Sequence, residues 1–325
     1  MPAPSPLSPL TQARIGVVGA TGAVGRVTLD LLAERGCEQV RAFSSSRSAG
    51  GRVPFAGGEL PLEEATPEAL SAGDVGLFLF SVGTEVSRAL VPHAVSGGAL
   101  VVDKSSAYRL VDGYPLVVPE VNGTRALEAL EGGRVVANPN CCAIPLSSVL
   151  APLAEAAGLA RVRVATYQSV SGAGEEAMAR LRSESAADHD LRMDWEFDGV
   201  EFDEEVKLRE ETRKILELPG LALSATCVRV PVLVGHAEAV WVETAEPLQL
   251  KQARDLLGAR PGLRLVEAPS PGQASGLDEI LVGRLRQDEQ SDELALFIAC
   301  DNLRKGAALN AIQIAELLLA APNTI

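Results

Sequence analysis

Residues 14–25 have the sequence RIGVVGATGAVG, which gives the clearest indication of the fold. It starts as a short apolar run, passes through glycines spaced three apart, and leads into a helical pattern of apolar residues that reaches Leu32. Such glycines permit a tight turn and let a phosphate approach the N-terminus of the helix. A glycine pattern alone is weak evidence, because glycine-rich turns are common. The strand before it and the amphipathic helix after it indicate a dinucleotide-binding βα unit.

The next predicted strand, residues 39–43, ends in the polar sequence SSSRS, residues 44–48. An NAD site usually places Asp or Glu here, where the carboxylate binds the 2′-hydroxyl of the ribose. Hydroxyl groups and Arg47 are instead the groups that would accept a 2′-phosphate. Arg47 is also compatible with a solvated loop charge, but the missing carboxylate favours NADP.

Two apolar runs, 75–80 and 99–102, are continuous enough for parallel strands that are covered on both faces. A short polar segment follows each run, and ligands bind beyond the carboxyl ends of such strands. We therefore expect these segments to line the cofactor cleft; Arg109 follows the second. Further short strands are predicted at 115–121 and 134–137.

The sequence NPNCC, residues 138–142, forms a predicted strand-to-helix turn before a helix over 144–157. Cys141 would lie at the first turn of that helix, where unpaired N–H groups and the helix dipole favour a thiolate. A free cysteine is more often a small buried hydrophobe, so the turn alone leaves both interpretations open. Of the three histidines, His236 follows a glycine at a turn between two apolar strands. By elimination it is the best candidate for an acid/base partner of the thiol.

The second half of the chain has many predicted strands and few helices. An alternating strand at 162–168 is followed by a helix from 175 towards 187 and an acidic, irregular segment at 188–200. The pattern predicts a mostly antiparallel sheet with one exposed face and a long helix at 302–321. Its further elements are a charged helix at 203–216 and strands at 223–230, 237–242, 263–266, 280–285 and 294–299.

Three charged residues in this half allow two interpretations each. Arg229 lies in an apolar strand, so it is either half of a structural ion pair or a clamp for a carboxylate ligand. Glu204 and Lys207 share one helix face. Without other information, a surface ion pair is the favoured interpretation of these two.

Composition narrows the class of protein. The chain has 325 residues, of which 47% are hydrophobic, and a net charge of -14, which argues against nucleic-acid or anionic membrane partners. Five cysteines without a CxxC motif argue against a disulfide framework or a metal site and favour a reducing, cytoplasmic location. Residues 1–13, rich in Pro and Ser, are expected to be a disordered extension without signal-peptide features. No apolar run reaches the roughly 18 residues of a membrane span.

Strings of residues in order from about residue 14 to residue 318 resemble one known family. They are GVVGATGAVG, SSRSAG, PLVVPEVN, NPNC, TYQSVSGAG, EEVKLREETRKI, SATCVRVPVLVGHAEAV, VGRLRQD and DNLRKGAALNAIQIAE. The family is that of the aspartate-β-semialdehyde dehydrogenases. The resemblance implies an α/β fold with a Rossmann-type NADP-binding domain and an α+β substrate and dimerisation domain with a mostly antiparallel sheet. The first would span 14–140 and be completed by a C-terminal helix at 303–325, and the second would span 141–302 in a homodimer or homotetramer.

The implied reaction is the reversible, NADPH-dependent reductive dephosphorylation of L-aspartyl-β-phosphate, in the biosynthesis of lysine, threonine and methionine. Cys141 matches the nucleophile, His236 the acid/base group and Gln168 the residue that orients the thioacyl intermediate. Arg229 matches the clamp for the substrate α-carboxylate and Glu204 the partner of its amino group, while Lys207 and Arg109 match the phosphate-binding pair. The positions that match cofactor contacts are Gly19, Thr21, Gly22, Ala23, Val24, Arg47, Ser48, Gly174 and Asn310.

The sequence departs from the family pattern at three places. Cys142 replaces a Ser or Thr after the nucleophile, Lys104 replaces an Asn, and the acidic stretch 188–201 replaces a longer segment that helps to shape the subunit interface. Two alternatives remain at this point. One is a reductase of another acyl phosphate, such as N-acetylglutamyl phosphate, and the other is a non-catalytic homologue, which would be expected to lose the thiol or the base.

Overall fold

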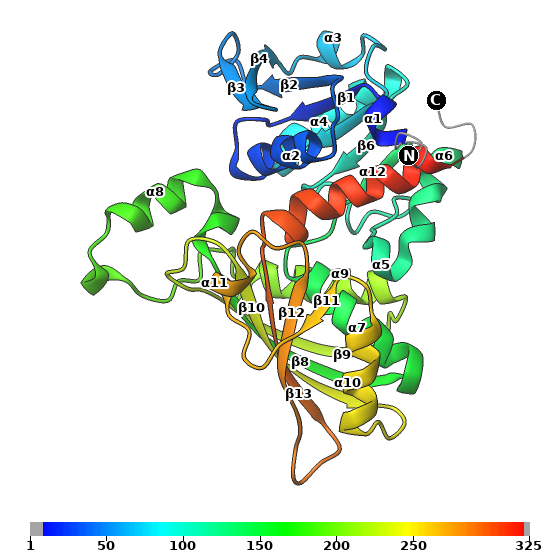
Figure 1. Ribbon diagram of the computed structural model, residues 1–325, viewed down its shortest axis with the longest axis vertical. Coiled ribbons are helices and arrows are strands. Elements are labelled where there is room, and N and C mark those ends of the chain that lie inside the picture. The colour runs from blue at the N-terminus through cyan, green and yellow to red at the C-terminus, as the bar shows by residue number, and fades with distance from the viewer. Residues whose placement is uncertain (1–8, 322–325) are drawn as a thin grey trace, which may run out of the picture. The chain divides into compact units, whose positions relative to one another are not determined.

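The computed structural model describes residues 9–321 and divides into two compact units (Figure 1). The first unit runs to Asn138 and resumes at Ala308, and the second is Pro139–Ala307. The first unit is dominated by a parallel sheet and the second by a mixed one, which confirms the predicted fold class. Among the described helices, none has the length and apolarity needed to cross a membrane.

The first unit contains a seven-stranded sheet in the order β3-β4-β2-β1-β5-β6-β7. All neighbouring strands are parallel except the pair β3 and β4 at one edge. Because β1 pairs in register with β2 and β5, the carboxyl ends of these strands lie at one edge, next to the glycine loop. The strands are β1 Ile15–Val18, β2 Val40–Ser44, β3 Arg52–Phe55, β4 Gly58–Glu64, β5 Leu77–Phe80, β6 Leu100–Asp103 and β7 Val135–Ala137.

Helices cover both faces of this sheet because its strands are apolar on both sides. One core contains apolar residues of α2 and α12, which lie side by side in Figure 1. The other lies under α4 and contains the three packed rings of Phe43, Phe78 and Phe80. The helices of this unit are α1 Pro9–Gln12, α2 Ala23–Glu34, α3 Pro67–Leu70, α4 Thr84–Ser96, α5 Pro119–Asn122, η1 Gly123–Leu127, α6 Glu128–Glu131 and α12 Asn310–Ala320.

Several predictions about this unit are wrong in detail. Residues 9–13 are ordered rather than a disordered extension, because Leu10 is buried in the core, while residues 1–8 lie outside the described part of the chain. The strand expected at 115–121 is a single bridge at Leu116 followed by α5, since Pro119 provides a helix start. The final helix begins as a π-helix, η4 Arg304–Leu309, before α12.

The second unit contains a six-stranded sheet in the order β11-β12-β13-β10-β8-β9. Its three central pairings are antiparallel and the pairing at each edge is parallel. Strand β8 alternates buried and exposed residues from Val162 onward, as its sequence predicted. The strands are β8 Leu159–Gln168, β9 Ala222–Arg229, β10 His236–Thr244, β11 Leu263–Leu265, β12 Ile280–Gln287 and β13 Leu294–Cys300.

Helices α7, α9 and α10 pack against one face of this sheet (Figure 1). Part of the opposite face lies under α11, and the rest is open, with the half-buried or exposed rings of Tyr167, Trp241 and Phe297. The helices are α7 Ala143–Ala157, α8 Glu175–Ser183, α9 Asp203–Leu216, α10 Leu250–Ala259 and α11 Pro271–Ala274, with short 3₁₀ turns η2 Val170–Ala173 and η3 Ala186–Asp188.

Candidate active site

Cys141 lies in the turn that leads into α7, as the sequence predicted. Its neighbour Cys142 is the N-cap residue of that helix and is completely buried, whereas Cys141 is only half-buried. Asn140 fixes the turn: its Oδ1 accepts a hydrogen bond from the Cys142 N–H at 2.8 Å, and its Nδ2 donates to Glu204 Oε1 at 2.9 Å. Its own N–H donates to Glu211 at 2.6 Å, so α9 holds the turn from two sides.

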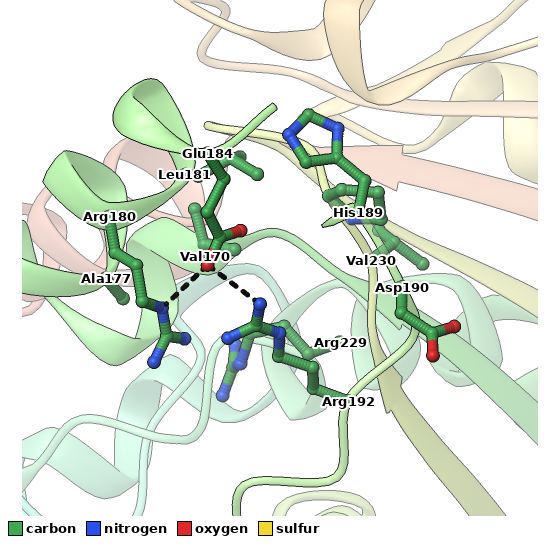
Figure 2. Close-up of a pocket in the computed structure, with 11 residues that line it drawn as sticks. Val170, Ala177, Arg180, Leu181, Glu184, His189, Asp190, Arg192, Arg229 and Val230 are labelled. Carbon is green, nitrogen blue, oxygen red and sulfur yellow. Dashed lines mark hydrogen bonds and ion pairs between the residues drawn. The ribbon is translucent and has the colours of Figure 1, made fainter. Parts of the chain in front are cut away.

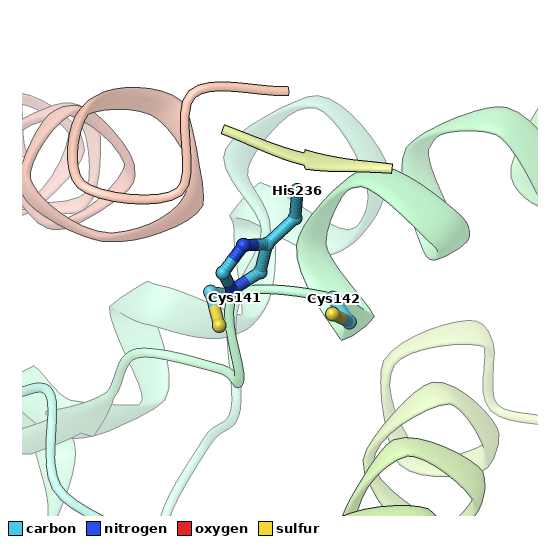
Figure 3. A group of neighbouring side chains, drawn as sticks. All are labelled: Cys141, Cys142 and His236. Carbon is cyan, nitrogen blue, oxygen red and sulfur yellow. The ribbon is translucent and has the colours of Figure 1, made fainter. Parts of the chain in front are cut away.

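His236 lies beside both thiols (Figure 3). The two sulfur atoms and one ring nitrogen of His236 are all within 4.8 Å of one another. The imidazole is buried, and its Nδ1 accepts a hydrogen bond from the Ser169 backbone N–H at 3.0 Å. In the neutral ring the proton is therefore on Nε2, which has no hydrogen-bond partner within residues 9–321. His93 lies in α4 of the first unit, and His189 lines a separate pocket in the second.

The sheet register places the other candidates in the same row as His236. Gln168 pairs with Arg229 across β8 and β9, and His236 pairs with Cys300 across β10 and β13. Gln168 is buried, and its Nε2 donates to Cys142 Sγ at 2.9 Å and to Glu204 Oε1 at 3.1 Å. The amide thus contacts the second thiol and not, in this structure, the expected nucleophile.

Arg229 is buried and bound on several sides. Its Nε donates to both carboxylate oxygens of Asp194, at 2.9 and 3.1 Å, and its Nη1 donates to the Ser169 carbonyl at 3.0 Å. The guanidinium also stacks 4.6 Å from the centre of the Trp195 ring. A Cβ atom on Gly172 would lie 3.2 Å from Arg229 Nη1 and 3.3 Å from His236 Nε2. The absence of a side chain at Gly172 therefore lets its backbone lie close to both groups, which a Cβ atom would crowd.

The pair Glu204 and Lys207 is not the surface ion pair that the sequence alone favoured. Glu204 is buried and accepts the two amide hydrogen bonds described above. Lys207 Nζ lies 3.9 Å from Glu204 but 2.6 Å from Asp203, which is its main partner. Glu204 is therefore buried within the unit, whereas Lys207 is partly exposed.

Sequence reasoning missed Glu238. It is buried next to the two thiols, and neither carboxylate oxygen has a hydrogen-bond partner within the described chain. Burial raises the pKa of Glu238 well above its usual range, and the nearby Cys141 adds to this effect. The sequence did offer one indication of its position. Side chains alternate between the two faces of a strand, so residues 236 and 238 share one face of β10.

The acidic segment 188–201, predicted as a loop, also packs against Arg229. Residues Arg192 and Arg229 form an isolated β-bridge, which holds this segment against the end of β9. Figure 2 shows the adjoining pocket, where Glu184 binds Arg192 at 2.8 Å and Arg180 at 3.5 Å. The departure from the family pattern therefore supplies Asp194 and Trp195, the side chains that contact Arg229.

The glycine loop of the first unit has the shape of a phosphate cradle. Gly19 has φ +85°, and a Cβ atom there would lie 2.3 Å from the Ser81 carbonyl oxygen. A Cβ atom on Gly25 would lie 2.1 Å from the Gly19 oxygen, so neither glycine can be replaced without moving the backbone. Gly22 caps α2 without a side-chain hydrogen bond, which leaves the first-turn N–H groups of Ala23 and Val24 for an anion. Thr21 lies in the same loop.

The other residues predicted to contact the cofactor lie in three places. Arg47 is exposed in the turn after β2, together with Ser48, and makes no hydrogen bond or ion pair within residues 9–321. Asn310 is buried; its Nδ2 donates to the Val117 carbonyl and to Asn138, but its Oδ1 has no partner in the described chain. An unpaired buried acceptor of this kind is suited to an amide donor from a ligand. Gly174, with φ +94°, lies in the second unit before α8.

Arg109 and Lys104 lie together in the first unit. Arg109 donates from Nε to the Asn138 carbonyl at 2.9 Å and from Nη2 to the Lys104 carbonyl at 2.6 Å. Lys104 Nζ donates to Thr28 Oγ1 on α2 at 2.8 Å. Burial lowers the pKa of Lys104 to about 7, although the attraction of Asp103 opposes the shift.

Comparison with known proteins gives a consistent result. The family model described as "Semialdehyde dehydrogenase, NAD binding domain" matches residues 14–129, and "Semialdehyde dehydrogenase, dimerisation domain" matches residues 150–305. The chain is 43% identical to the aspartate-semialdehyde dehydrogenase of Corynebacterium glutamicum, over 94% of this chain and 99% of the relative. It is 39% identical to that of Bacillus subtilis, over 94% and 96%. Aspartate semialdehyde dehydrogenase II from Vibrio cholerae, solved in complex with ASA, has a TM-score of 0.90 and 36% identity over 95% of this chain and 99% of that one.

Proposed function

The chain belongs to the aspartate-semialdehyde dehydrogenase family, and from this premise we propose how its residues divide the work of the reaction. The protein is an NADPH-dependent, phosphorylating aldehyde dehydrogenase that converts L-aspartyl-β-phosphate to L-aspartate-β-semialdehyde and phosphate, and back. One observation supports the division of roles above all others: the sulfur of Cys141 and a ring nitrogen of His236 lie within 4.8 Å of each other.

Cys141 is the nucleophile in this proposal. Its sulfur attacks the acyl carbon, a C–S bond forms, and the bond to phosphate breaks with its electron pair leaving on phosphate. Bound NADPH supplies the hydride that reduces the resulting thioester. His236 then protonates or hydrogen-bonds the developing oxyanion through Nε2–H, since Nδ1 is already occupied by the Ser169 N–H. The C–S bond then breaks with its electron pair leaving on sulfur, His236 takes back any proton on the oxygen, and the aldehyde and the Cys141 thiolate result.

Specificity for the amino acid comes from two buried charges. Arg229 binds the α-carboxylate, and Glu204 binds the α-ammonium group. The buried carboxylate of Glu204 accepts hydrogen bonds from the side-chain amides of Asn140 and Gln168. The cation next to it, Lys207, has its Nζ 3.9 Å from Glu204 Oε2. A substrate ammonium therefore completes its charge balance, whereas an acylated amine cannot. This disfavours the N-acetylglutamyl alternative.

Arg109 and Lys207 are proposed to bind the phosphate. The chain has a net charge of -14, and its overall electrostatic field repels an anion. Cations placed directly at the binding site would offset this repulsion. The backbone carbonyls of Asn138 and Lys104 orient the Arg109 side chain.

The cofactor fits the first unit. The loop at Gly19, Thr21 and Gly22 and the start of α2 at Ala23 and Val24 would hold the pyrophosphate. Arg47 and Ser48 would bind the 2′-phosphate, which gives the preference for NADP. Asn310, through its unpaired Oδ1, and Gly174 would lie near the nicotinamide.

We also propose a homodimer as the assembly unit. The second unit matches a dimerisation domain, and its sheet has an open face with Tyr167, Trp241 and Phe297. Aromatic side chains are enriched in interfaces between subunits. Five free thiols agree with a cytoplasmic location, which remains part of the proposal.

A phosphate-dependent assay tests the reaction and the nucleophile together. Purified protein is mixed with L-aspartate-β-semialdehyde, phosphate and NADP, and nicotinamide absorbance is followed for wild type and Cys141→Ser. We expect turnover that requires phosphate and that disappears in the variant. Turnover with the N-acetylated glutamate analogue instead would contradict the substrate assignment, and full activity of Cys141→Ser would contradict the nucleophile.

A further inference from the structure

Asp194 binds the guanidinium of Arg229, the group that we propose as the clamp for the substrate carboxylate. It comes from the acidic segment 188–201, where the sequence departs from the family pattern, and both of its oxygens contact Arg229 Nε. We propose that Asp194 is a positioning residue, which holds the Nε edge of Arg229 so that the Nη edge faces the substrate. The inference rests on the role of Arg229 in the proposed function.

The geometry separates the two edges of the guanidinium. Of its five N–H groups, Nε–H binds Asp194 and one Nη1–H binds the Ser169 carbonyl at 3.0 Å. The second Nη1–H and both Nη2–H groups have no hydrogen-bond partner within the described residues. Because neither oxygen of Asp194 bonds to Nη2, the end-on pair of nitrogens remains available. That pair is the fork that matches a carboxylate with two parallel hydrogen bonds.

Arg229 Nη1, one of the two nitrogens of the available edge, lies beside Gly172. A Cβ atom on Gly172 would be 3.2 Å from Arg229 Nη1 and 3.3 Å from His236 Nε2. The clamp proposed for the carboxylate and the proposed proton donor for the reacting carbonyl therefore lie close to the same glycine. A short amino-acid substrate, in which these two groups are a few bonds apart, needs this proximity.

Three contacts fix the plane of the guanidinium before substrate arrives. Asp194 holds its Nε edge, the Ser169 carbonyl holds Nη1, and the Trp195 ring covers one face at 4.6 Å. An arginine side chain that is held in advance loses less conformational freedom when it binds a ligand. The side chain of Asp194 is 33% exposed whereas that of Arg229 is 5% exposed, so water screens Asp194 when a second carboxylate approaches.

In the rival interpretation, Asp194 competes with the substrate carboxylate for Arg229. The two interpretations predict opposite changes in the KM for the semialdehyde when Asp194 is removed. If Asp194 blocked the clamp, its removal would free Arg229 and lower the KM for the semialdehyde. If Asp194 positions the clamp, its removal loosens the guanidinium and raises that KM. A purely structural role would change all kinetic constants or the folded fraction, without selecting one substrate.

The test compares Asp194→Asn and Asp194→Ala with wild type in the assay with semialdehyde, phosphate and NADP. We expect the KM for the semialdehyde to rise about 5- to 50-fold in Asp194→Ala and less in Asp194→Asn, which keeps an acceptor oxygen. The kcat and the KM values for phosphate and NADP should change by less than about threefold. In an Arg229→Leu background, Asp194→Asn should add no further change, since the partner that it positions is gone.

Asp190→Asn is the matched control. It removes one negative charge from the same segment, and its carboxylate bonds only to the neighbouring Leu191 N–H. We expect wild-type constants for this variant. A lower or unchanged semialdehyde KM in both Asp194 variants would overturn the proposal, as would an equal rise in the Asp190 control. All of these outcomes require that wild type is active. If wild type itself shows no turnover, the proposed function fails, and that result is distinct from failure of the role of Asp194.

Discussion

The Ser169 backbone N–H donates a hydrogen bond to His236 Nδ1 at 3.0 Å. A main-chain donor, rather than a carboxylate, therefore orients this imidazole and places its proton on Nε2. Since Ser169 directly follows the last residue of β8, the end of this strand sets the orientation of the imidazole that we propose as the acid/base group.

The first prediction concerns this proton. Replacing His236 by Gln keeps a hydrogen-bond donor of similar reach but removes the imidazole that would transfer the proton. We expect kcat to fall on the order of 10²- to 10⁴-fold, because that is the usual contribution of a positioned acid or base. Steady-state kinetics with circular dichroism as a folding control measure the effect. A folded His236→Gln variant with less than about a tenfold loss would show that another group moves the proton.

The second prediction separates the neighbouring thiols. Cys142 is buried, and its sulfur accepts a hydrogen bond from the Gln168 side-chain amide. A serine hydroxyl in its place can accept the same hydrogen bond. We expect Cys142→Ser to keep kcat within about fivefold of wild type, whereas Cys141→Ser loses it.

Alkylation gives an independent measure for the two thiols. Burial raises the pKa of Cys142 well above its ordinary value, and the neighbouring Cys141 adds to the shift. An alkylating reagent at neutral pH should therefore modify Cys141 in native protein and spare Cys142. Peptide mapping by mass spectrometry identifies the labelled residue. Preferential labelling of Cys142 would reverse the assignment.

The sequence predicted the elements of the site better than its contacts. The glycine loop, the turn at Cys141 and the helix at 203–216 follow from local patterns, and the structure has them where they were expected. The partners of Arg229 and Gln168 did not follow, because they depend on the register of β8 with β9 and on a segment without a regular pattern. Long-range pairings of this kind leave no local periodicity in the sequence.

Glu238 provides the third prediction. Its folded-state pKa is raised by burial, so above the unfolded pKa the folded protein retains this proton more readily than the unfolded chain does. Its contribution to stability therefore falls as pH rises above the unfolded pKa, which is about 4.3 for glutamate. Glu238→Gln removes this dependence.

We expect Glu238→Gln to be more stable than wild type at neutral pH, with a difference that shrinks towards pH 4 to 5, on the order of the unfolded pKa. Urea unfolding at several pH values provides the free energies of unfolding. A difference that is constant with pH would mean that Glu238 is not protonated in the folded state.

Lys104 gives the fourth prediction, with the opposite sign. Its folded-state pKa is about 7, well below the ordinary value for lysine. Between that pKa and the unfolded value of about 10.4, the unfolded chain holds more protons, so stability rises with pH. Below pH 7, both states are charged and the full cost of burial remains.

Lys104→Gln should therefore stabilise the protein most at low pH. We expect its advantage over wild type to shrink by about 1–2 kcal/mol between about pH 7 and 8.5. The measurement is urea unfolding without cofactor, with Lys251→Gln as a control, because Lys251 is exposed and bonds only to Asp255 on its own helix. An advantage that grows with pH would exclude a buried, easily deprotonated Lys104.

The last prediction concerns the open face of the second sheet. Trp241 pairs with Arg163 of β8 and Ala295 of β13, near the centre of the six strands and on the face away from α7. Tyr167 and Phe297 pack on the same face, with ring centres 6.0 Å apart. If this face joins two subunits, a charge at Trp241 would be buried without a partner, and such a charge is costly.

Trp241→Glu should therefore dissociate the dimer at micromolar protein concentration while each subunit stays folded. Sedimentation velocity gives the mass, and circular dichroism reports the fold. Lys251→Glu, on the helix-covered side of the same sheet, introduces the same side chain at an exposed position and should remain dimeric. A dimeric Trp241→Glu variant would move the interface to another surface, whereas dissociation of both variants would point to a general effect of added negative charge on a chain that already carries -14.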